Sequence, residues 1–183
     1  MDRGSAWALL CEHTKGESLR KHGLAVEAAM RHFARKFGED EEIWAVVGIL
    51  HDFDYERFPT EHPQAGKPIL EAAGMAPTLV RAIQSHGDHT GVTRESRLER
   101  TLYAVDELTG FVIAVALVKP GKQLASVDAA SVRKKMKDKA FARAVDREAM
   151  LRGAVDLGVP FDELVGEVVG ALKGVAPELG LAA

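Results

Sequence analysis

The most informative stretch for the fold is EDEEIWAVVGILHD, residues Glu39–Asp52. Four acidic residues open it, and acidic side chains favour a helix N-terminus because they oppose its partial positive charge. The apolar segment Ile43–Leu50 follows and ends in the pair His51-Asp52. This pattern predicts a buried helix that delivers two metal-ligating side-chain types at its C-terminal end.

Upstream, the sequence predicts a long amphipathic helix from about Ser18 to Phe37, ended by Gly38. At 100° per residue its apolar side chains fall in one narrow sector, and His22 is the polar member of that sector. The opposite side carries Arg20, Glu27, Arg31 and Arg35. His22 is therefore expected to point toward the core.

Downstream, Phe53–Glu61 is expected to be a loop, and Pro63 the first position of a short helix closed by Gly74, with His62 directly before it. Pro77 opens the next predicted helix, which ends near Ser85-His86-Gly87. A long helix is then predicted from about Glu95 to Val118, with Lys119-Pro120-Gly121 as its stop. On it, Asp106 shares a face with Leu102, Ile113 and Leu117, and Glu99 is expected to be a frayed or partly exposed exception.

Two or three more helices are predicted in the C-terminal third, at about Asp128–Asp138, Ala140–Leu157 and Phe161–Lys173. Alternating β-branched stretches, which are typical of strands, are absent. The sequence therefore predicts an all-α, single-domain helical bundle over residues 1–183. Its motif-bearing core spans about 18–120, and the C-terminal helices span 121–183.

Composition excludes several classes of function. The chain has a net charge of −3, so no global basic field favours a nucleic acid polymer or an anionic membrane as partner. Cys11 is its only cysteine, which excludes an intramolecular disulfide and cysteine-based zinc sites. The longest apolar run, Phe111–Val118, is far shorter than the roughly 20 residues of a membrane span. We expect a cytoplasmic protein and interpret this run as core, with a homodimer face left open.

Ionisable side chains on predicted core faces recur along the chain. Burying such a group costs several kcal/mol unless it is paired or binds a metal. One histidine on an apolar face is usually a satisfied core histidine, but four such residues, His22, His51, Asp52 and Asp106, lie on or at the end of apolar faces. Imidazole nitrogens and carboxylate oxygens suit Mn, Fe, Co, Ni or Zn. A divalent metal ion would explain why these groups are tolerated together.

The order of these residues on helices resembles the HD superfamily of metal-dependent phosphohydrolases. The resemblance rests on Lys21-His22-Gly23, Gly48–Asp52 and Ala104–Gly110, within a matching stretch of about Ser18–Pro120. It implies a primary metal site of His22, His51, Asp52 and Asp106, with Asp52 able to bridge to a second ion and His51-Asp52 as the catalytic centre.

The stretch His51–Gly66, HDFDYERFPTEHPQAG, is also similar to uncharacterised bacterial and archaeal HD proteins. That similarity adds His62 and His86 as ligands and implies one or two divalent ions per chain, of Mn, Fe, Co, Ni, Mg or Zn. Tyr55 stands where some nucleotidase members place a glutamate, and the flanking Asp54 and Glu56 are candidate replacements. The chain lacks the Gly-Tyr-Pro motif and tandem histidines of the cyclic-dinucleotide branch, and it has no room for the added helices of the dGTP triphosphohydrolase branch.

The candidate substrate-binding residues are cations and a histidine that lie near the predicted ligands in the sequence. Lys67, Lys119 and Lys122 are predicted to hold a substrate phosphate, and His89 to contact substrate. Asp88 is interpreted as a turn residue. Asp54 and Glu107 are candidates for contacts that orient the ligating histidines, although an exposed, solvated acid is the favoured interpretation of Glu107.

The leading hypothesis is a phosphohydrolase that attacks a small phosphate ester or nucleotide with a metal-activated water. A small phosphorylated molecule is then the expected partner. Two alternatives stay open. One is an HD-fold oxygenase that uses two irons, and the other is a non-catalytic module that binds a metal or a ligand.

Overall fold

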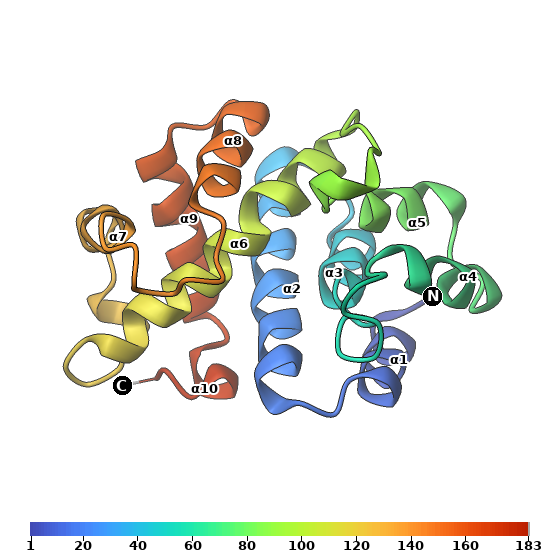
Figure 1. The fold of residues 1–183 in the computed structure, drawn as a ribbon, viewed down its shortest axis with the longest axis horizontal. Coiled ribbons are helices and arrows are strands. Elements are labelled where there is room, and N and C mark those ends of the chain that lie inside the picture. The colour runs from blue at the N-terminus through green and yellow to red at the C-terminus, as the bar shows by residue number, and fades with distance from the viewer. Residues whose placement is uncertain (183) are drawn as a thin grey trace.

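The computed structural model describes residues 1–182, and this part of the chain forms ten α-helices and no strand (Figure 1). The predicted all-α class is therefore confirmed. The helices are α1 (Arg3–His13), α2 (Glu17–Phe37), α3 (Glu41–Leu50), α4 (Lys67–Ala72), α5 (Pro77–Gln84), α6 (Arg97–Val118), α7 (Ala129–Met136), α8 (Arg147–Leu157), α9 (Phe161–Lys173) and α10 (Ala176–Leu179). Short 3₁₀ turns lie at Gln64–Gly66, Asp88–Thr90 and Leu124–Ser126.

Helix α2 stands in the middle of the bundle, with α3 on one side and α9 on the other (Figure 1). Helix α6 crosses α2 and then packs on α8 and α9. Buried apolar side chains form one cluster, from Ala6 in α1 to Leu181 near the C-terminus. The packing of α2, α3 and α6 on one another sets the spacing of the candidate site described below.

Two glycines allow neighbouring helices to approach closely. A Cβ atom on Gly48 would lie 3.0 Å from Glu27 Cα in α2, and one on Gly153 would lie 2.6 Å from Ala104 Cα in α6. Carbon atoms in favourable contact are about 3.5–4.0 Å apart, so a side chain at either position would push the helices apart. Gly48 lets α3 lie directly against α2, three residues before His51.

Helix α6 begins at Arg97 because a capping box fixes its N-terminus. The Ser96 hydroxyl accepts the Glu99 N–H, and the Glu99 carboxylate accepts the N–H groups of Ser96 and Glu95 at 2.7 Å each. Burial raises the pKa of Glu99, but these donors and Arg81 outweigh burial and hold the pKa below its usual value. The expectation of a frayed or partly exposed Glu99 was wrong, because only 3% of its side chain is exposed.

Helix α8 begins at Arg147, so the helix predicted over Ala140–Leu157 was wrong in its first part. Ala142 has a φ of 43°, outside the α-helical region, and Asp146 caps α8 by accepting two N–H groups of its first turn. The Arg147 guanidinium donates to five backbone carbonyls between Met136 and Val145. These tertiary contacts hold the segment before α8 in a non-helical conformation.

The other helix boundaries largely follow the predictions. Gly38, with a φ of 72°, ends α2, and Pro77 opens α5. Pro63 does not open α4: it precedes a 3₁₀ turn, and the helix begins at Lys67 with Pro68 in its first turn. Helices α1 and α10 were not predicted at all.

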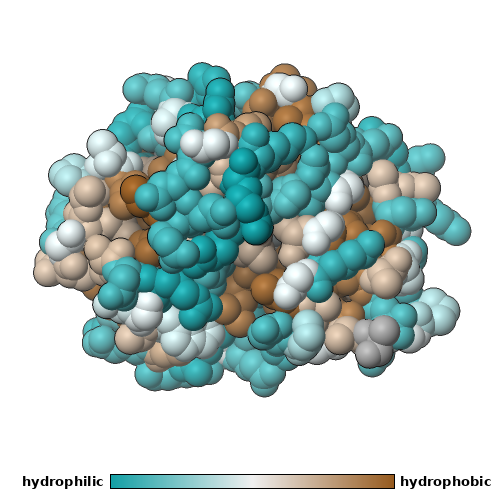
Figure 2. Space-filling model, turned by 180° about the vertical axis from the view of Figure 1, so that it is seen from behind, coloured by the Kyte–Doolittle hydropathy of each residue, from teal (hydrophilic) through white to brown (hydrophobic). Residues whose placement is uncertain are grey.

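Helix α6 is long and apolar enough to span a membrane by length and composition, but most of it is buried in the bundle. The predicted core assignment of Phe111–Val118 is confirmed for Phe111, Val112, Val115 and Ala116, whereas Leu117 and Val118 are exposed. Hydrophilic side chains cover most of the face behind the view of Figure 1, with smaller apolar areas between them (Figure 2). Helix α6 is thus a core helix of this bundle.

Candidate metal centre

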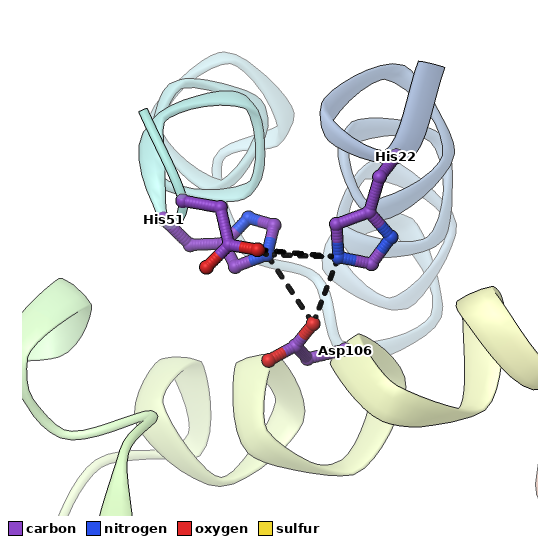
Figure 3. A group of neighbouring side chains, drawn as sticks. His22, His51 and Asp106 are labelled. Carbon is purple, nitrogen blue, oxygen red and sulfur yellow. Dashed lines mark hydrogen bonds and ion pairs between the residues drawn. The ribbon is translucent and has the colours of Figure 1, made fainter. Parts of the chain in front are cut away.

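Three candidate ligands come from the three central helices. His22 lies in α2, His51 directly follows α3, and Asp106 lies in α6 (Figure 3). His22 Nε2 is 3.1 Å from His51 Nε2 and 3.0 Å from Asp106 Oδ1. His51 Nε2 is 3.2 Å from the same Asp106 oxygen. Side chains far apart in the sequence thus point to one place, as Figure 3 shows.

Two more candidate ligands follow α3 in the chain. His62 lies just before the first 3₁₀ turn, and His86 lies just after α5. Both side chains are buried, and their Nε2 atoms are 3.0 Å apart. Asp52 Oδ1 lies 3.1 Å from His62 Nε2 and 3.4 Å from His86 Nε2. The two histidines and this carboxylate oxygen therefore also converge.

Asp52 belongs to both sets of residues. Its second oxygen, Oδ2, lies 3.5 Å from His51 Nε2 and 3.7 Å from His22 Nε2. One carboxylate thus presents one oxygen to each side. We call His22, His51, Asp52 and Asp106 the first ligand group, and Asp52, His62 and His86 the second ligand group.

The hydrogen bonds of the Nδ1 atoms, which face away from the cluster, fix the protonation of the Nε2 atoms, which face into it. His51 Nδ1 lies 2.7 Å from the Gly48 carbonyl oxygen, and His86 Nδ1 lies 2.5 Å from that of Ile83. A carbonyl has no proton to give, so each Nδ1 carries the N–H, and Nε2 of the neutral ring has only a lone pair. These lone pairs point at other nitrogens and at carboxylate oxygens. The cluster therefore requires positive charge at its centre.

The distances suit divalent ions. Ligand bonds of about 2.1 Å place neighbouring donor atoms about 3.0 Å apart at right angles and about 3.4 Å apart in a tetrahedron. Within each ligand group, the separations between the Nε2 and carboxylate oxygen atoms given above run from 3.0 Å to 3.7 Å. Four imidazoles and two carboxylates form a ligand set for Mn, Fe, Co, Ni or Zn. The residues present therefore fit one ion in each ligand group.

The pKa values of the candidate ligands also show that the cluster attracts positive charge. Burial lowers the pKa of His51, but the Asp52 and Asp106 carboxylates outweigh burial and raise it well above its usual value. At His62 burial is likewise outweighed, by Asp52 and Asp54, and the pKa is raised to about 9. The facing histidines hold the pKa values of Asp52 and Asp106 well below their usual range in spite of burial. A divalent ion would take the place of the protons that the histidines hold.

Asp54 orients His62. Its Oδ1 accepts the His62 Nδ1–H at 2.6 Å, and its side chain is buried. Such a contact fixes both the ring orientation and the proton of a ligating histidine. Glu56 has a different task, because its carboxylate accepts the backbone N–H groups of Lys15 and Gly16 just before α2.

A cavity of about 550 Å³ opens beside the ligands. Its walls include α6, the 3₁₀ turn after α5, and the start of α8, and four of the six candidate ligands line it: His22, Asp52, His86 and Asp106. Tyr55 also lines it and is 47% exposed, so its ring lies at the edge. A small molecule in this cavity would lie against the first ligand group.

Glu107 lines the cavity and is not the exposed, solvated acid that we expected. Burial, reinforced by the neighbouring Asp106, raises the pKa of Glu107 to about 7. Its Oε2 accepts the backbone N–H of Asp146 at 3.3 Å. Glu107 therefore forms part of the cavity wall, and within residues 1–182 it makes no hydrogen bond to a ligating histidine.

Asp88 does more than form a turn. It accepts a hydrogen bond from the Tyr103 hydroxyl at 2.9 Å and pairs with Arg94 and Arg152, each at 2.9 Å. The Arg94 guanidinium also stacks over the Tyr103 ring, 3.6 Å from its centre. This network ties the turn after α5 to α6 and α8.

The four residues predicted to bind substrate lie in different places. His89 lines the cavity, and its Nε2 is 2.7 Å from the His62 carbonyl oxygen. Lys67 is exposed at the start of α4 and does not line the cavity. Lys119 and Lys122 follow the C-terminal end of α6, about 20 Å along the helix axis from Asp106. The length of α6 carries Lys119 and Lys122 away from Asp106, and none of the three lysines lines the cavity.

Sequence reasoning missed several cavity residues. Tyr103 and Gly110 lie one turn before and one turn after Asp106 on the same face of α6, so helical spacing could have revealed them. Val145 and Ala149 also line the cavity. They come from a distant segment, and no local pattern in the sequence points to them.

The fold and the site together define an all-helical protein with a candidate metal centre of histidines and aspartates. The family model described as HD domain matches residues 19–110, about half of the chain, and this range includes all six candidate ligands. The chain belongs to the HD-domain family, whose members are generally metal-dependent phosphohydrolases. Searches of curated proteins and of solved structures found no significant match.

Proposed function

We propose that this protein is a metal-dependent phosphohydrolase that acts on a small phosphate ester or a nucleotide. The observation that carries the proposal is the position of Asp52, whose two oxygens face two separate sets of imidazole nitrogens. A pair of divalent ions beside one cavity suits the displacement of an alcohol from phosphate by water. A cytoplasmic location belongs to the same proposal, because α6 is a core helix.

The first ligand group would hold one ion and the second ligand group another. When bound, such ions lower the pKa of water toward about 7 and polarise phosphoryl oxygens. The protein's own contribution is to fix the ligands beforehand. The carbonyls of Gly48 and Ile83 and the carboxylate of Asp54 hold the outer ring protons, which turns the inner lone pairs toward the centre.

The test measures phosphate release by protein stripped with a chelator and reloaded with Mn, Fe, Co, Ni, Mg or Zn. The substrates are a panel of phosphomonoesters and nucleotides. We expect release that depends on an added ion and is lost in Asp52→Ala. Asp162→Ala, at an exposed position on α9, is the matched control and should keep the activity. Folded, metal-loaded protein that releases no phosphate from any ester would contradict the proposal.

A second candidate is a two-iron oxygenase, which the same six nitrogen and oxygen ligands favour because they also suit iron. Metal content after aerobic and anaerobic purification separates the two functions. Full phosphatase activity with a redox-inert metal would eliminate the oxygenase. Substrate turnover that requires iron and dioxygen would eliminate the hydrolase.

A further inference from the structure

The side chains that line the cavity offer few free hydrogen-bond donors. The Tyr103 hydroxyl donates to Asp88 at 2.9 Å, and the ring of His89 contacts the His62 carbonyl oxygen at 2.7 Å. Among residues 1–182, no lysine and no arginine lines this cavity. Outside the ligands themselves, the cavity therefore provides no fixed positive charge.

Acceptors, in contrast, are available in the cavity wall formed by α6 and the start of α8. Glu107 and Asp146 both line it. Oε2 of Glu107 accepts only the long 3.3 Å bond from the Asp146 N–H, and no donor from residues 1–182 reaches its Oε1. Asp146 uses Oδ1 to cap α8, and its Oδ2 lies 3.7 Å from Arg152 in a side chain that is 54% exposed.

We propose that the substrate is a phosphomonoester with a single phosphoryl group and an alcohol part that carries hydroxyl or ammonium donors. This inference rests on the phosphohydrolase function proposed above. The metal centre supplies positive charge for one phosphoryl group. A second phosphoryl group in the cavity would meet the carboxylates of Glu107 and Asp146. The Arg152 guanidinium near Asp146 does not line the cavity and is already paired with Asp88 at 2.9 Å.

The size of the cavity agrees with such a substrate. Its volume of about 550 Å³ lies within the range of small-molecule sites, about 300–1,000 Å³. A phosphorylated sugar or amino alcohol fits this volume and places its donors within reach of Glu107. A polynucleotide does not suit the site, because its successive phosphates are bound mainly through lysine and arginine.

The experiment compares kcat/KM of the manganese-loaded enzyme on four esters. Glucose 6-phosphate and 6-aminohexyl phosphate carry donors, hexyl phosphate carries none, and glucose 1,6-bisphosphate adds a second phosphoryl group. A hydrogen bond from the substrate to an acceptor that otherwise has no partner gives a preference of about fivefold or more. We therefore expect both donor-bearing monoesters to exceed hexyl phosphate by that factor, and the bisphosphate to be poorer than glucose 6-phosphate.

Variants at Glu107 test the proposed contact. Glu107→Leu removes the acceptor and should bring both ratios to hexyl phosphate toward one. Glu107→Gln keeps an amide oxygen, so the preference for hydroxyl donors should survive while the preference for ammonium falls. Glu148→Gln, exposed in the first turn of α8, is the matched control and should leave both ratios unchanged.

The outcomes distinguish failure of the substrate inference from failure of the proposed phosphohydrolase function. If hexyl phosphate or the bisphosphate is the best ester, or if neither Glu107 variant changes a ratio, the substrate inference is overturned and the phosphohydrolase function stands. If none of the esters, nor any other phosphoester, is hydrolysed with any ion, the function itself fails and the inference with it. Should Glu107→Leu not fold, the wild-type ratios and Glu107→Gln decide.

Discussion

The two ligand groups share Asp52 but are built in different ways. His22 and Asp106 of the first group lie on the long helices α2 and α6, which pack directly on each other. His62 and His86 of the second group lie on short segments, outside regular α-helix. A ligand on a packed helix is held by the core, whereas one on a short segment depends on single hydrogen bonds, here with Asp54 and the Ile83 carbonyl. The first group should therefore form with the fold, and the second should be the more easily lost.

The largest effect is expected for Asp52→Ala, because this change removes a ligand from both groups and leaves four imidazoles without their shared carboxylate. We expect both ions to be lost and activity to fall by at least about a thousandfold, which corresponds to about 4 kcal/mol of transition-state stabilisation. Elemental analysis after gel filtration and phosphate release measure the two quantities. An Asp52→Ala protein that keeps two ions would contradict the shared position of this residue.

Single histidine changes sharpen the comparison. His62→Ala should lower the metal content from two ions per chain to one, because the first ligand group remains complete. His22→Ala should weaken the ion of the first group instead. His32→Ala is the control on the same helix as His22, since His32 contacts Glu167 on α9 and no ligand. Equal loss of both ions in His62→Ala would show that the groups are not separable.

Asp54→Asn tests the dependence of the second ligand group on one contact. The change removes the charge that orients His62, and loss of such an outer partner weakens metal affinity by about 10- to 100-fold. We expect this loss for one ion only, with the other ion bound as in the parent. Calorimetric titration with Mn²⁺ resolves the two affinities, and a uniform decrease in both would count against the proposed difference between the groups.

Gly48→Ala tests whether helix packing sets the first ligand group. The added Cβ would lie 3.0 Å from Glu27 Cα, so α3 has to shift away from α2. We expect the free energy of unfolding to fall by about 1–3 kcal/mol, with weaker metal binding at the first group. Gly170→Ala in α9 is the control, because its Cβ would meet nothing within 4 Å, and it should be neutral or slightly stabilising. Denaturant unfolding compares the two variants.

The smallest effect is expected for Glu99→Gln, which weakens the capping box of the helix that carries Asp106. The pKa of Glu99 is lowered in the folded protein, so its carboxylate stabilises the fold above the ordinary value of 4.5. That contribution is lost as the pH falls through the lowered pKa. We expect a difference of about 1 kcal/mol in unfolding free energy at pH 7 that shrinks toward pH 3. A difference that is the same at both pH values would contradict this account.

Much of the central fold was predictable because local signals agreed. The apolar face around His22, the acidic start of α3 and the Lys119-Pro120-Gly121 stop all indicate elements that the structure contains. Helix α1 was missed, although it packs on α3, because its apolar residues give no clear helical face. The late start of α8 could not be predicted, since Arg147 makes its contacts with carbonyls only in the folded chain.

The candidate site was predictable where polarity conflicts with burial. His51 and Asp106 stand out because an ionisable group interrupts an apolar pattern. The cavity walls were not predictable, because Val145 and Ala149 are ordinary residues brought near α6 by the packing of α8. Lys119 and Lys122 are close to the ligand helix in sequence, but the length of α6 carries them away from Asp106.

The central claim is that one ion binds on each side of Asp52. Its most direct test is a crystal structure of the manganese-loaded protein with anomalous scattering measured at the manganese edge. We expect two anomalous peaks, one between Asp52 Oδ2 and the Nε2 atoms of His22 and His51, and one between Asp52 Oδ1 and those of His62 and His86. A single peak at full occupancy, or peaks away from Asp52, would contradict the central claim.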